Sequence, residues 1–256
     1  MTEGVSCLCL TYGRPALLEE AVESFLRQRW EGPKELVVLN DHPEQKLRFD
    51  HPEVRVVNLP LRLPTLGAKR NVSVALARFE NLLVWDDDDI HLPWRIEETM
   101  KVLPRQGYFK CPEVWVMRGG ELQGRRSEGA LLNHGATAYT KSRFERAAGY
   151  RGFNGGEDQD FELRLWRDPE FGHLCRMTAL PPERLYYIRR WGHGSYHASG
   201  CTNLRSLAAP VAAGVRDLRP HWKADYCGQV ARHVRRDARR PPPAGEALRA
   251  ATRQEL

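Results

Sequence analysis

Residues 5–85 alternate short apolar runs with amphipathic stretches, and this alternation limits the fold more than any other feature of the sequence. Two stretches, residues 16–30 and 65–79, carry apolar residues at helical spacing. Strands that alternate with helices in this way pair in parallel through right-handed crossovers. We therefore expect an α/β fold with a mostly parallel central sheet. The expected strands are residues 5–11, 36–39, 54–59 and 82–85.

Polar residues stand where three of these expected strands end. Thr11 ends the first strand, Asp41 follows the second, and the aspartates from Asp86 to Asp89 follow the fourth. In open parallel sheets, ligands bind beyond the carboxyl ends of the strands. We therefore expect these side chains to lie at one ligand site.

The run Asp86, Asp87, Asp88 and Asp89 places like charges side by side, so it needs a cation or broad contact with solvent. Because side chains alternate along extended chain, we expect Asp86 and Asp88 on one side and Asp87 and Asp89 on the other. Carboxylates suit Mg²⁺ or Mn²⁺ shared with phosphate oxygens. A calcium loop is disfavoured by the residues that follow. The remaining alternative is an acidic surface turn that caps the next helix.

Glu157 and Asp158 follow two glycines and open an expected helix. Acidic residues in a first turn ordinarily satisfy free N–H groups and complement the helix dipole. A carboxylate in this position could instead act as a general base toward an acceptor hydroxyl. The residues alone leave both interpretations open.

The rest of the chain is less regular. We expect extended segments at residues 108–117, 137–140 and 184–190, with helices from about residue 93 and at 142–148. Gly119, Gly120 and Gly124 indicate turns. In the helix at residues 65–79, the side chains expected to face inward are Val72, Ala75, Leu76 and Phe79.

We divide the chain into a domain at residues 1–200, an extension at 201–238 and a basic, proline-rich tail at 239–256 that we expect to be disordered. Residues 201–256 hold 11 Arg and Lys against 5 Asp and Glu, which accounts for the whole net charge of +6. Since residues 1–200 are neutral overall, nucleic-acid binding is not expected. The basic end is either solvated or a peripheral contact with anionic lipid or another polyanion.

The sequence contains neither a recognisable signal segment nor a continuous apolar stretch long enough for a membrane span. We therefore expect a cytoplasmic protein. Its six cysteines form no C-x-x-C pair, so we expect reduced thiols rather than zinc ligands.

Five separated motifs together resemble glycosyltransferase family 2, in order and in spacing, over roughly residues 5–200. The resemblance implies a GT-A-type, Rossmann-like single domain. It also implies an inverting, metal-assisted transfer of a hexosyl or N-acetylhexosaminyl group from a nucleotide-diphosphate sugar to a hydroxyl of a glycan, lipid or small molecule. The motifs are residues 5–15, 39–41, 67–71, 85–93 and 156–161.

By this resemblance, the donor, a UDP-sugar, lies on residues at the ends of strands and helices. The first strand end would hold the nucleotide base, the second would contact uracil through a carboxylate, and the helix from residue 65 would contact phosphate or ribose. The implied donor-binding residues are Thr11, Tyr12, Arg14, Asp41, Lys69, Arg70, Asn71, Asp86, Asp87 and Arg190.

Asp86 and Asp88 align with the family's D-x-D motif, and Asp88 is the expected direct ligand of Mn²⁺ or Mg²⁺. In similar enzymes a late histidine completes the metal shell, and His193 and His197 both qualify; either could equally be an ordinary surface or packed histidine. Asp158 aligns with the catalytic base of the family. Its neighbour Glu157 is the second catalytic candidate.

Two segments depart from the family pattern. The family commonly has Asp-Asp-Gly-Ser after its second strand, where this chain has Asn40-Asp41-His42-Pro43, and residues 122–134 match no motif. Two other functions stay open. A nucleotidyltransferase would usually carry a loop after the first strand that is richer in glycine and in basic residues. A catalytically silent sugar-nucleotide-binding module would not need the Glu157-Asp158 pair.

Overall fold

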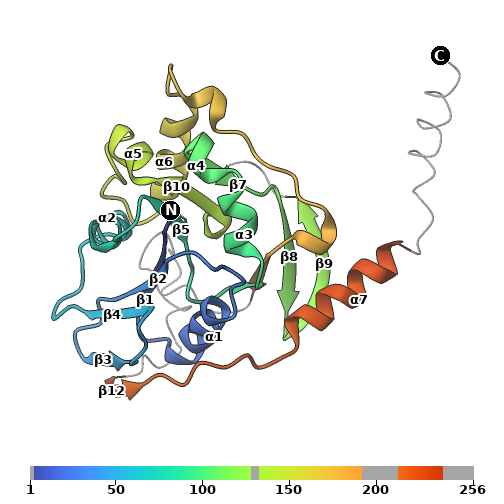
Figure 1. Cartoon of the computed structure of the whole chain (residues 1–256). Helices are drawn as coiled ribbons and strands as arrows, with labels where there is room; N and C mark the ends of the chain where they lie inside the picture. The colour runs from blue at the N-terminus through green and yellow to red at the C-terminus, as the bar shows by residue number, and fades with distance from the viewer. Residues whose placement is uncertain (1–2, 128–132, 192–212, 239–256) are drawn as a thin grey trace, which may run out of the picture.

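The computed structural model describes residues 3–127, 133–191 and 213–238 and is organised around a six-stranded sheet (Figure 1). β1 pairs in parallel with β2 and β5, β2 pairs in parallel with β4, and β10 runs antiparallel to both β5 and β7. This confirms the predicted α/β class with a mostly parallel sheet. In spatial order the strands are β4 (Val54–Asn58), β2 (Lys34–Asn40), β1 (Val5–Thr11), β5 (Asn81–Val84), β10 (Thr137–Thr140) and β7 (Tyr108–Lys110).

Helices cover both faces of this sheet because both faces of its strands are apolar. In β1, Cys7 and Cys9 belong to the core with α1 (Pro15–Leu26) and α3 (Arg95–Met100). Leu8 points to the opposite core, which α2 and α6 complete with Val74 and Phe161. Strands buried on both sides read as continuous apolar runs, as these do. The helices on this second face are α2 (Leu66–Leu76), α5 (Lys141–Arg146) and α6 (Glu157–Trp166).

Several local predictions need correction. α1 ends at Leu26, four residues before the predicted end. α2 ends at Leu76, so Phe79 lies outside the helix, and within it Ala75 is exposed whereas Val74 is buried, so the buried face is rotated from the predicted one. The predicted extended segment at residues 108–117 is two strands in different sheets, β7 and β8 (Glu113–Arg118). The chain divides at Pro112, which has no N–H for a strand ladder.

A second sheet has the order β6-β11-β8-β9 and begins directly after the aspartate run. Its strands are β6 (Ile90–His91), β11 (Tyr187–Trp191), β8 and β9 (Glu121–Ser127). Gly119 and Gly120 form the predicted turn between β8 and β9, with φ of 56° and 82°, whereas Gly124, also predicted to mark a turn, lies within β9 opposite Val116. The polar strand β9 was not predicted, because Leu122 is its only buried residue. Pairing of β11 with β6 brings residues 187–190 beside Asp89.

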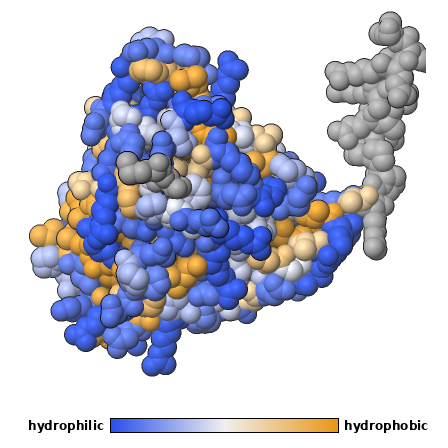
Figure 2. Space-filling view, viewed as in Figure 1, coloured by the Kyte–Doolittle hydropathy of each residue, from blue (hydrophilic) through white to orange (hydrophobic). Residues whose placement is uncertain are grey.

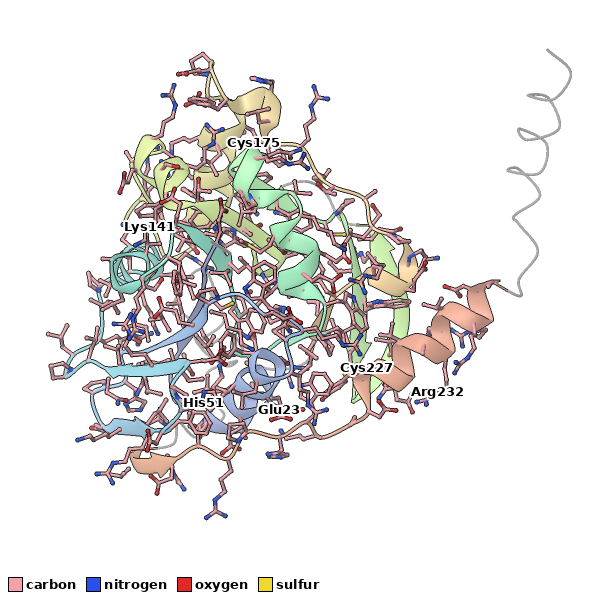
Figure 3. All side chains as sticks on the ribbon, viewed as in Figure 1. Glu23, His51, Lys141, Cys175, Cys227 and Arg232 are labelled. Atoms are coloured by element: carbon pink, nitrogen blue, oxygen red, sulfur yellow. The ribbon has the colours of Figure 1, made fainter. Side chains whose placement is uncertain are left out.

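The described part of the C-terminal extension contacts the domain along its length, including hydrogen bonds from Arg219, Trp222 and Lys223 to α1. β12 (Gly214–Asp217) pairs in parallel with β3 (Gln45–Arg48), and α7 (Tyr226–Ala238) buries Tyr226 and Val230. Figure 3 labels Cys227 at the inner end of α7 and Arg232 farther along the helix. Short turns complete the fold: α4 (Leu103–Gln106), η1 (His134–Ala136), η2 (Gly172–Leu174) and η3 (Pro182–Arg184).

Across the described residues, none of the helices is both long and apolar enough to span a membrane. The described cysteines are all free thiols, and four of them are buried. They are Cys7, Cys9, Cys111, Cys175 and Cys227.

Candidate active site

The aspartate run lies at the carboxyl edge of the parallel strands and alternates in exposure as predicted. Asp86 and Asp88 are partly exposed, whereas Asp87 and Asp89 are 1% and 5% exposed. Burial therefore excludes a solvent-facing role for Asp87 and Asp89. Only Asp86 and Asp88 can present oxygens to a ligand on the open side.

Arg14 holds two of the aspartates. Its Nη1 donates to Oδ2 of Asp88 at 3.0 Å, and its Nη2 forms a close ion pair with Oδ1 of Asp87. Thr11 Oγ1 donates to the other oxygen of Asp87 at 2.7 Å. Burial alone would lower the pKa of Arg14, but the two carboxylates outweigh it and raise that pKa. Thr11, Arg14 and Asp87 thus form one buried cluster beneath Asp88.

Asp89 is tied to the second sheet. Its Oδ2 accepts a hydrogen bond from the Tyr187 hydroxyl and its Oδ1 accepts one from the Arg190 N–H at 2.7 Å. Burial and the charges of Asp88 and Asp86 raise the pKa of Asp89 to about 8. The side chain of Arg190 donates to the backbone oxygen of Asp88 and, at 2.6 Å, to Glu20 of α1. Arg190 therefore anchors the aspartate run to α1.

Asp41 and Lys69, both predicted to bind donor, form a buried ion pair with each other. Lys69 Nζ donates to Oδ1 of Asp41 at 2.5 Å and to the backbone oxygen of Thr11 at 2.6 Å. The Leu63 N–H donates to Oδ2 of Asp41 at 3.1 Å. Burial lowers the pKa of Lys69, opposed by the charge of Asp41. Both oxygens of Asp41 thus already accept hydrogen bonds within the protein.

Tyr12 is a half-buried ring beside this pair. The His42 ring stacks on it with centroids 4.7 Å apart and planes 17° apart, and the Arg62 guanidinium lies 4.6 Å from its centroid. His42 occupies the position where the chain departs from the family pattern. The loop that follows β2 therefore contributes an aromatic ring to the predicted base site.

Arg70 joins the aspartate run to the catalytic candidates. Its Nε donates to Glu157 Oε1 at 3.0 Å. Burial alone would lower the pKa of Arg70, but the charges around it, which include Glu157, Asp86 and Asp158, outweigh burial and raise that pKa. The side-chain amide of the next residue, Asn71, donates to the backbone oxygen of Tyr150 and accepts from the Tyr150 N–H, each at 2.8 Å. Arg70 is thus central to the site, while Asn71 fixes the chain around it.

Glu157 and Asp158 differ in accessibility although they are neighbours on α6. Glu157 is 2% exposed and paired with Arg70, whereas Asp158 is partly exposed and accepts a hydrogen bond from the N–H of Gln159 at 2.9 Å. Gly156, with φ of 74°, is the N-cap residue immediately before the helix. Asp158 is therefore the carboxylate of this pair that an acceptor could reach.

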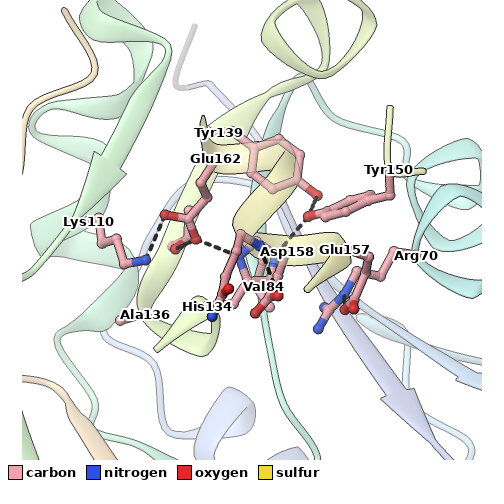
Figure 4. A network of polar contacts seen from close by, with 12 residues as sticks. Arg70, Val84, Lys110, His134, Ala136, Tyr139, Tyr150, Glu157, Asp158 and Glu162 are labelled. Atoms are coloured by element: carbon pink, nitrogen blue, oxygen red, sulfur yellow. Dashed lines mark hydrogen bonds and ion pairs between the residues drawn. The ribbon is translucent and has the colours of Figure 1, made fainter. Parts of the chain in front are cut away.

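A buried polar network lies behind these residues and was missed from sequence (Figure 4). Glu162 of α6 accepts from Lys110 Nζ at 2.6 Å, from the Tyr108 hydroxyl at 3.0 Å and from Thr137 Oγ1 at 3.0 Å. His134 is 2.7 Å from Glu162 Oε1. The one sequence feature that could have indicated this network was Glu162 itself, a carboxylate next to the buried Phe161 on the same helix.

Figure 4 shows this network continuing through His134 to Tyr150 and Tyr139. His134 Nε2 lies 2.8 Å from the Tyr150 hydroxyl, which donates to the Tyr139 hydroxyl at 2.8 Å. Burial would raise the pKa of Glu162, but the hydrogen bond from His134 and the charge of Lys110 lower it to about 2. These contacts join β7, β10 and η1 to the helix that carries Asp158.

The predicted metal site has the right chemistry for a hard cation. Asp86 and Asp88 supply carboxylate oxygens, which suit Mg²⁺ or Mn²⁺ when water and phosphate oxygens fill the other positions. Asp86 packs closely against Gly135, where a Cβ would lie 2.4 Å from Asp86 Oδ2, so this approach requires glycine. Within the described ranges, no three His, Cys, Asp or Glu side chains are grouped to hold a metal. His193 and His197 lie outside the described residues.

Solved structures with a similar fold are GT-A glycosyltransferases. The fragment 1–349 of S. aureus TarS in complex with UDP-GlcNAc matches with a TM-score of 0.54 and 16% identity, over 77% of this chain and 61% of that one. The mannosyltransferase PcManGT from Pyrobaculum calidifontis, in complex with GDP-Man and Mn²⁺, matches with a TM-score of 0.52 and 18% identity, over 74% of this chain and 57% of that one. This chain thus spans about 60% of their length, and the likeness shows the fold.

Sequence comparison identifies the family. No curated protein matches the chain significantly. The model of the family described as "Glycosyl transferase family 2" matches residues 6–157, which is more than half of the chain and includes the strand ends, the aspartate run and Glu157. This chain therefore belongs to glycosyl transferase family 2 and has the GT-A fold.

Proposed function

We propose that this protein transfers a sugar from a nucleoside diphosphate sugar to a hydroxyl group with inversion at the anomeric carbon. The observation that carries the proposal is the exposure of three carboxylates, since Asp86, Asp88 and Asp158 are partly exposed. Arg70 forms an ion pair at 3.0 Å with Glu157, the neighbour of Asp158. We assign the two functions that such a transfer needs, holding the diphosphate and accepting a proton, to these accessible carboxylates.

On the donor side, Asp88 and Asp86 would hold Mg²⁺ or Mn²⁺, with His193 or His197 as a further ligand. The metal would act as a Lewis acid and neutralise the leaving diphosphate. The half-buried Tyr12 ring, with the His42 ring and the Arg62 guanidinium packed against it, lies at the strand end where the resemblance places the nucleobase. We favour a UDP-sugar with a hexose or N-acetylhexosamine. The complexes of TarS with UDP-GlcNAc and of the mannosyltransferase with GDP-Man and Mn²⁺ support this class of donor.

On the acceptor side, Asp158 would accept the hydroxyl proton while that oxygen attacks the anomeric carbon from the face opposite the leaving diphosphate. A general base must be within hydrogen-bond reach of the proton it removes, so an accessible carboxylate is required. Asp158 meets this condition. The buried Glu157 does not, and its ion pair with Arg70 holds the first turn of α6 in place.

The proposal is tested first by donor binding. The melting temperature of the protein should rise with UDP, UDP-GlcNAc, GDP or GDP-mannose in the presence of Mn²⁺, and the rise should disappear in EDTA. A ligand at a hundred times its Kd stabilises by about 2.7 kcal/mol, which such an assay detects readily. If none of these nucleotides gives a metal-dependent rise in melting temperature, the proposal is refuted. Release of pyrophosphate from a nucleoside triphosphate would favour a nucleotidyltransferase instead.

Two variants then separate the roles of the carboxylates. Asp88→Asn should remove the metal-dependent shift, because it removes the expected ligand. Asp158→Asn should keep the shift and lose at least about a hundredfold in transfer or donor hydrolysis, the usual loss when a general base is removed. Asp217→Asn, an exposed change on β12, is the matched control and should behave like the unmodified protein. Loss of binding in Asp158→Asn would make Asp158 structural.

A further inference from the structure

Arg14 makes a contact that the proposed function does not explain. Its guanidinium spans the buried Asp87 and the Asp88 carboxylate, and only one oxygen of Asp88, Oδ2, takes part in the ion pair with Nη1. The side chain of Arg14 is 6% exposed, whereas that of Asp88 is 30% exposed. Arg14 therefore holds one oxygen of Asp88 from the buried side. This contact sets the orientation of the whole carboxylate, including its accessible part.

Carboxylates that bind metals are usually held by a hydrogen bond from a neighbouring side chain, which sets their orientation. A carboxylate anchored through one oxygen offers the other more freely to a cation, and coordination through a single oxygen suits the octahedral oxygen shell of Mg²⁺ and Mn²⁺. Without the anchor, Asp88 could rotate and bind through both oxygens. That mode suits Ca²⁺, which accepts bidentate carboxylates in a larger and more flexible shell.

We propose that Arg14 is a positioning residue that holds Asp88 for metal coordination through one oxygen and thereby favours Mn²⁺ and Mg²⁺ over Ca²⁺. This rests on the proposed function, which assigns the metal to Asp88. The role requires arginine, since its planar fork reaches both Asp87 and Asp88, whereas the single ammonium of lysine is a point charge that cannot reproduce two parallel contacts.

The test must keep the buried charges balanced, because Asp87 without its cation would be an unpaired buried carboxylate. The double variant Arg14→Gln/Asp87→Asn removes both charges together and frees Asp88. Arg14→Lys is the second variant. It keeps the positive charge but lacks the planar guanidinium that contacts both aspartates. Arg27→Gln, which breaks an exposed pair with Glu23 on α1, is the matched control. Circular dichroism and thermal melting establish that each variant is folded.

Mn²⁺ binding is measured by electron paramagnetic resonance of the free ion, alone and with UDP, and Ca²⁺ binding by its competition with Mn²⁺. We expect the double variant to bind Mn²⁺ roughly 10- to 100-fold more weakly, the usual cost of losing such a neighbour. The ratio of Ca²⁺ to Mn²⁺ affinity should rise by about threefold or more, because bidentate binding becomes possible. A merely structural role for Arg14 would weaken both ions equally. Arg14→Lys should show the same rise in the ratio of Ca²⁺ to Mn²⁺ affinity. Arg27→Gln should leave this ratio unchanged.

The outcomes separate this inference from the proposed function. If the unmodified protein binds no Mn²⁺ with or without UDP, the metal site and the proposed function are both wrong. If the unmodified protein binds Mn²⁺ and Asp88→Asn does not, the site stands. Unchanged or tighter Mn²⁺ binding in the double variant, or an unchanged ratio of the two ions in both Arg14 variants, would then overturn the role of Arg14 alone.

Discussion

At the scale of single residues, the site depends on buried ion pairs that hold a few accessible groups. Asp87 and Arg14, Asp41 and Lys69, and Glu157 and Arg70 are such pairs. A buried charge that loses its partner costs several kcal/mol, so these pairs fix the geometry more than they add stability. The partly exposed carboxylates Asp86, Asp88 and Asp158 are the groups left for ligands.

Glu162 should make the fold sensitive to acid. Its pKa in the folded protein, about 2, lies below the ordinary value of 4.5, so its contribution to stability is present above pH 4.5 and is lost as the pH falls toward 2. A shift of this size corresponds to about 3 kcal/mol. Urea unfolding of the unmodified protein should therefore show a falling free energy of unfolding between pH 5 and pH 3, as roughly expected for a paired carboxylate.

Glu162→Gln should lower the free energy of unfolding by about 3–5 kcal/mol at pH 7, because Lys110 is left buried without its anion. Its stability should also change less between pH 5 and pH 3 than that of the unmodified protein. Glu145→Gln, an exposed change on α5, is the control and should preserve the pH dependence. An equal pH slope in Glu162→Gln and the unmodified protein would mean that other groups dominate the acid response.

At the scale of elements, the loop before α6 is docked on the first turn of α2. The N–H of Leu66 donates to Asn154 Oδ1 at 3.0 Å and the N–H of Gly67 donates to the backbone oxygen of Phe153 at 3.1 Å. A Cβ on Gly67 would lie 1.8 Å from the backbone oxygen of Arg151. Glycine is therefore required for this close approach, and the approach determines where α6 and Asp158 lie.

Gly67→Ala should separate the loop from α2 and displace Asp158. We expect a loss of about 1–3 kcal/mol in the free energy of unfolding, the usual effect of overpacking, and a larger fall in kcat for transfer than in donor affinity. The control is Gly152→Ala in the same loop, where the nearest atom to a new Cβ is Thr65 Oγ1 at 3.8 Å. Urea unfolding and steady-state kinetics would reveal the difference, and equal behaviour of the two variants would contradict the docking argument.

At the scale of the whole molecule, α7 presents its basic side chains away from the core. Arg232, Arg235 and Arg236 are exposed while Tyr226 and Val230 are buried. Figure 2 shows both apolar and hydrophilic surface where α7 leaves the body of the protein. A helix with a basic face attracts anionic lipid by about 1 kcal/mol per charge near the surface. This surface is our candidate for the predicted peripheral membrane contact.

Vesicle co-sedimentation tests that contact. The protein should sediment with phosphatidylcholine vesicles that contain phosphatidylglycerol and remain in solution with phosphatidylcholine alone. The triple variant Arg232→Gln/Arg235→Gln/Arg236→Gln should bind at least about tenfold more weakly. Neutralising three exposed arginines elsewhere, Arg48, Arg78 and Arg176, should have a smaller effect. Equal binding of the two triple variants would show that net charge, and not α7, is responsible.

Much of the fold was predictable because it depends on local patterns. The apolar runs placed β1, β2, β4 and β5 to within one or two residues, and period-two alternation anticipated that Asp87 and Asp89 lie on the opposite side from Asp86 and Asp88, although not that they are buried. β9 was not predictable, because a polar edge strand that buries only Leu122 has no apolar alternation. The division of residues 108–117 between two sheets depends on long-range pairing that a local pattern does not encode.

The sequence by itself determined that parallel strands would end in polar residues at one edge, since the spacing of apolar residues along the chain sets both the elements and their order. Only the tertiary structure decided which of those polar residues are accessible. Lys69 reaches Asp41, Arg190 reaches Glu20 and His134 reaches Glu162 across separations of 28, 170 and 28 residues. Such pairs form because burial removes charges from water and each must then find a partner, and packing decides which partner is near.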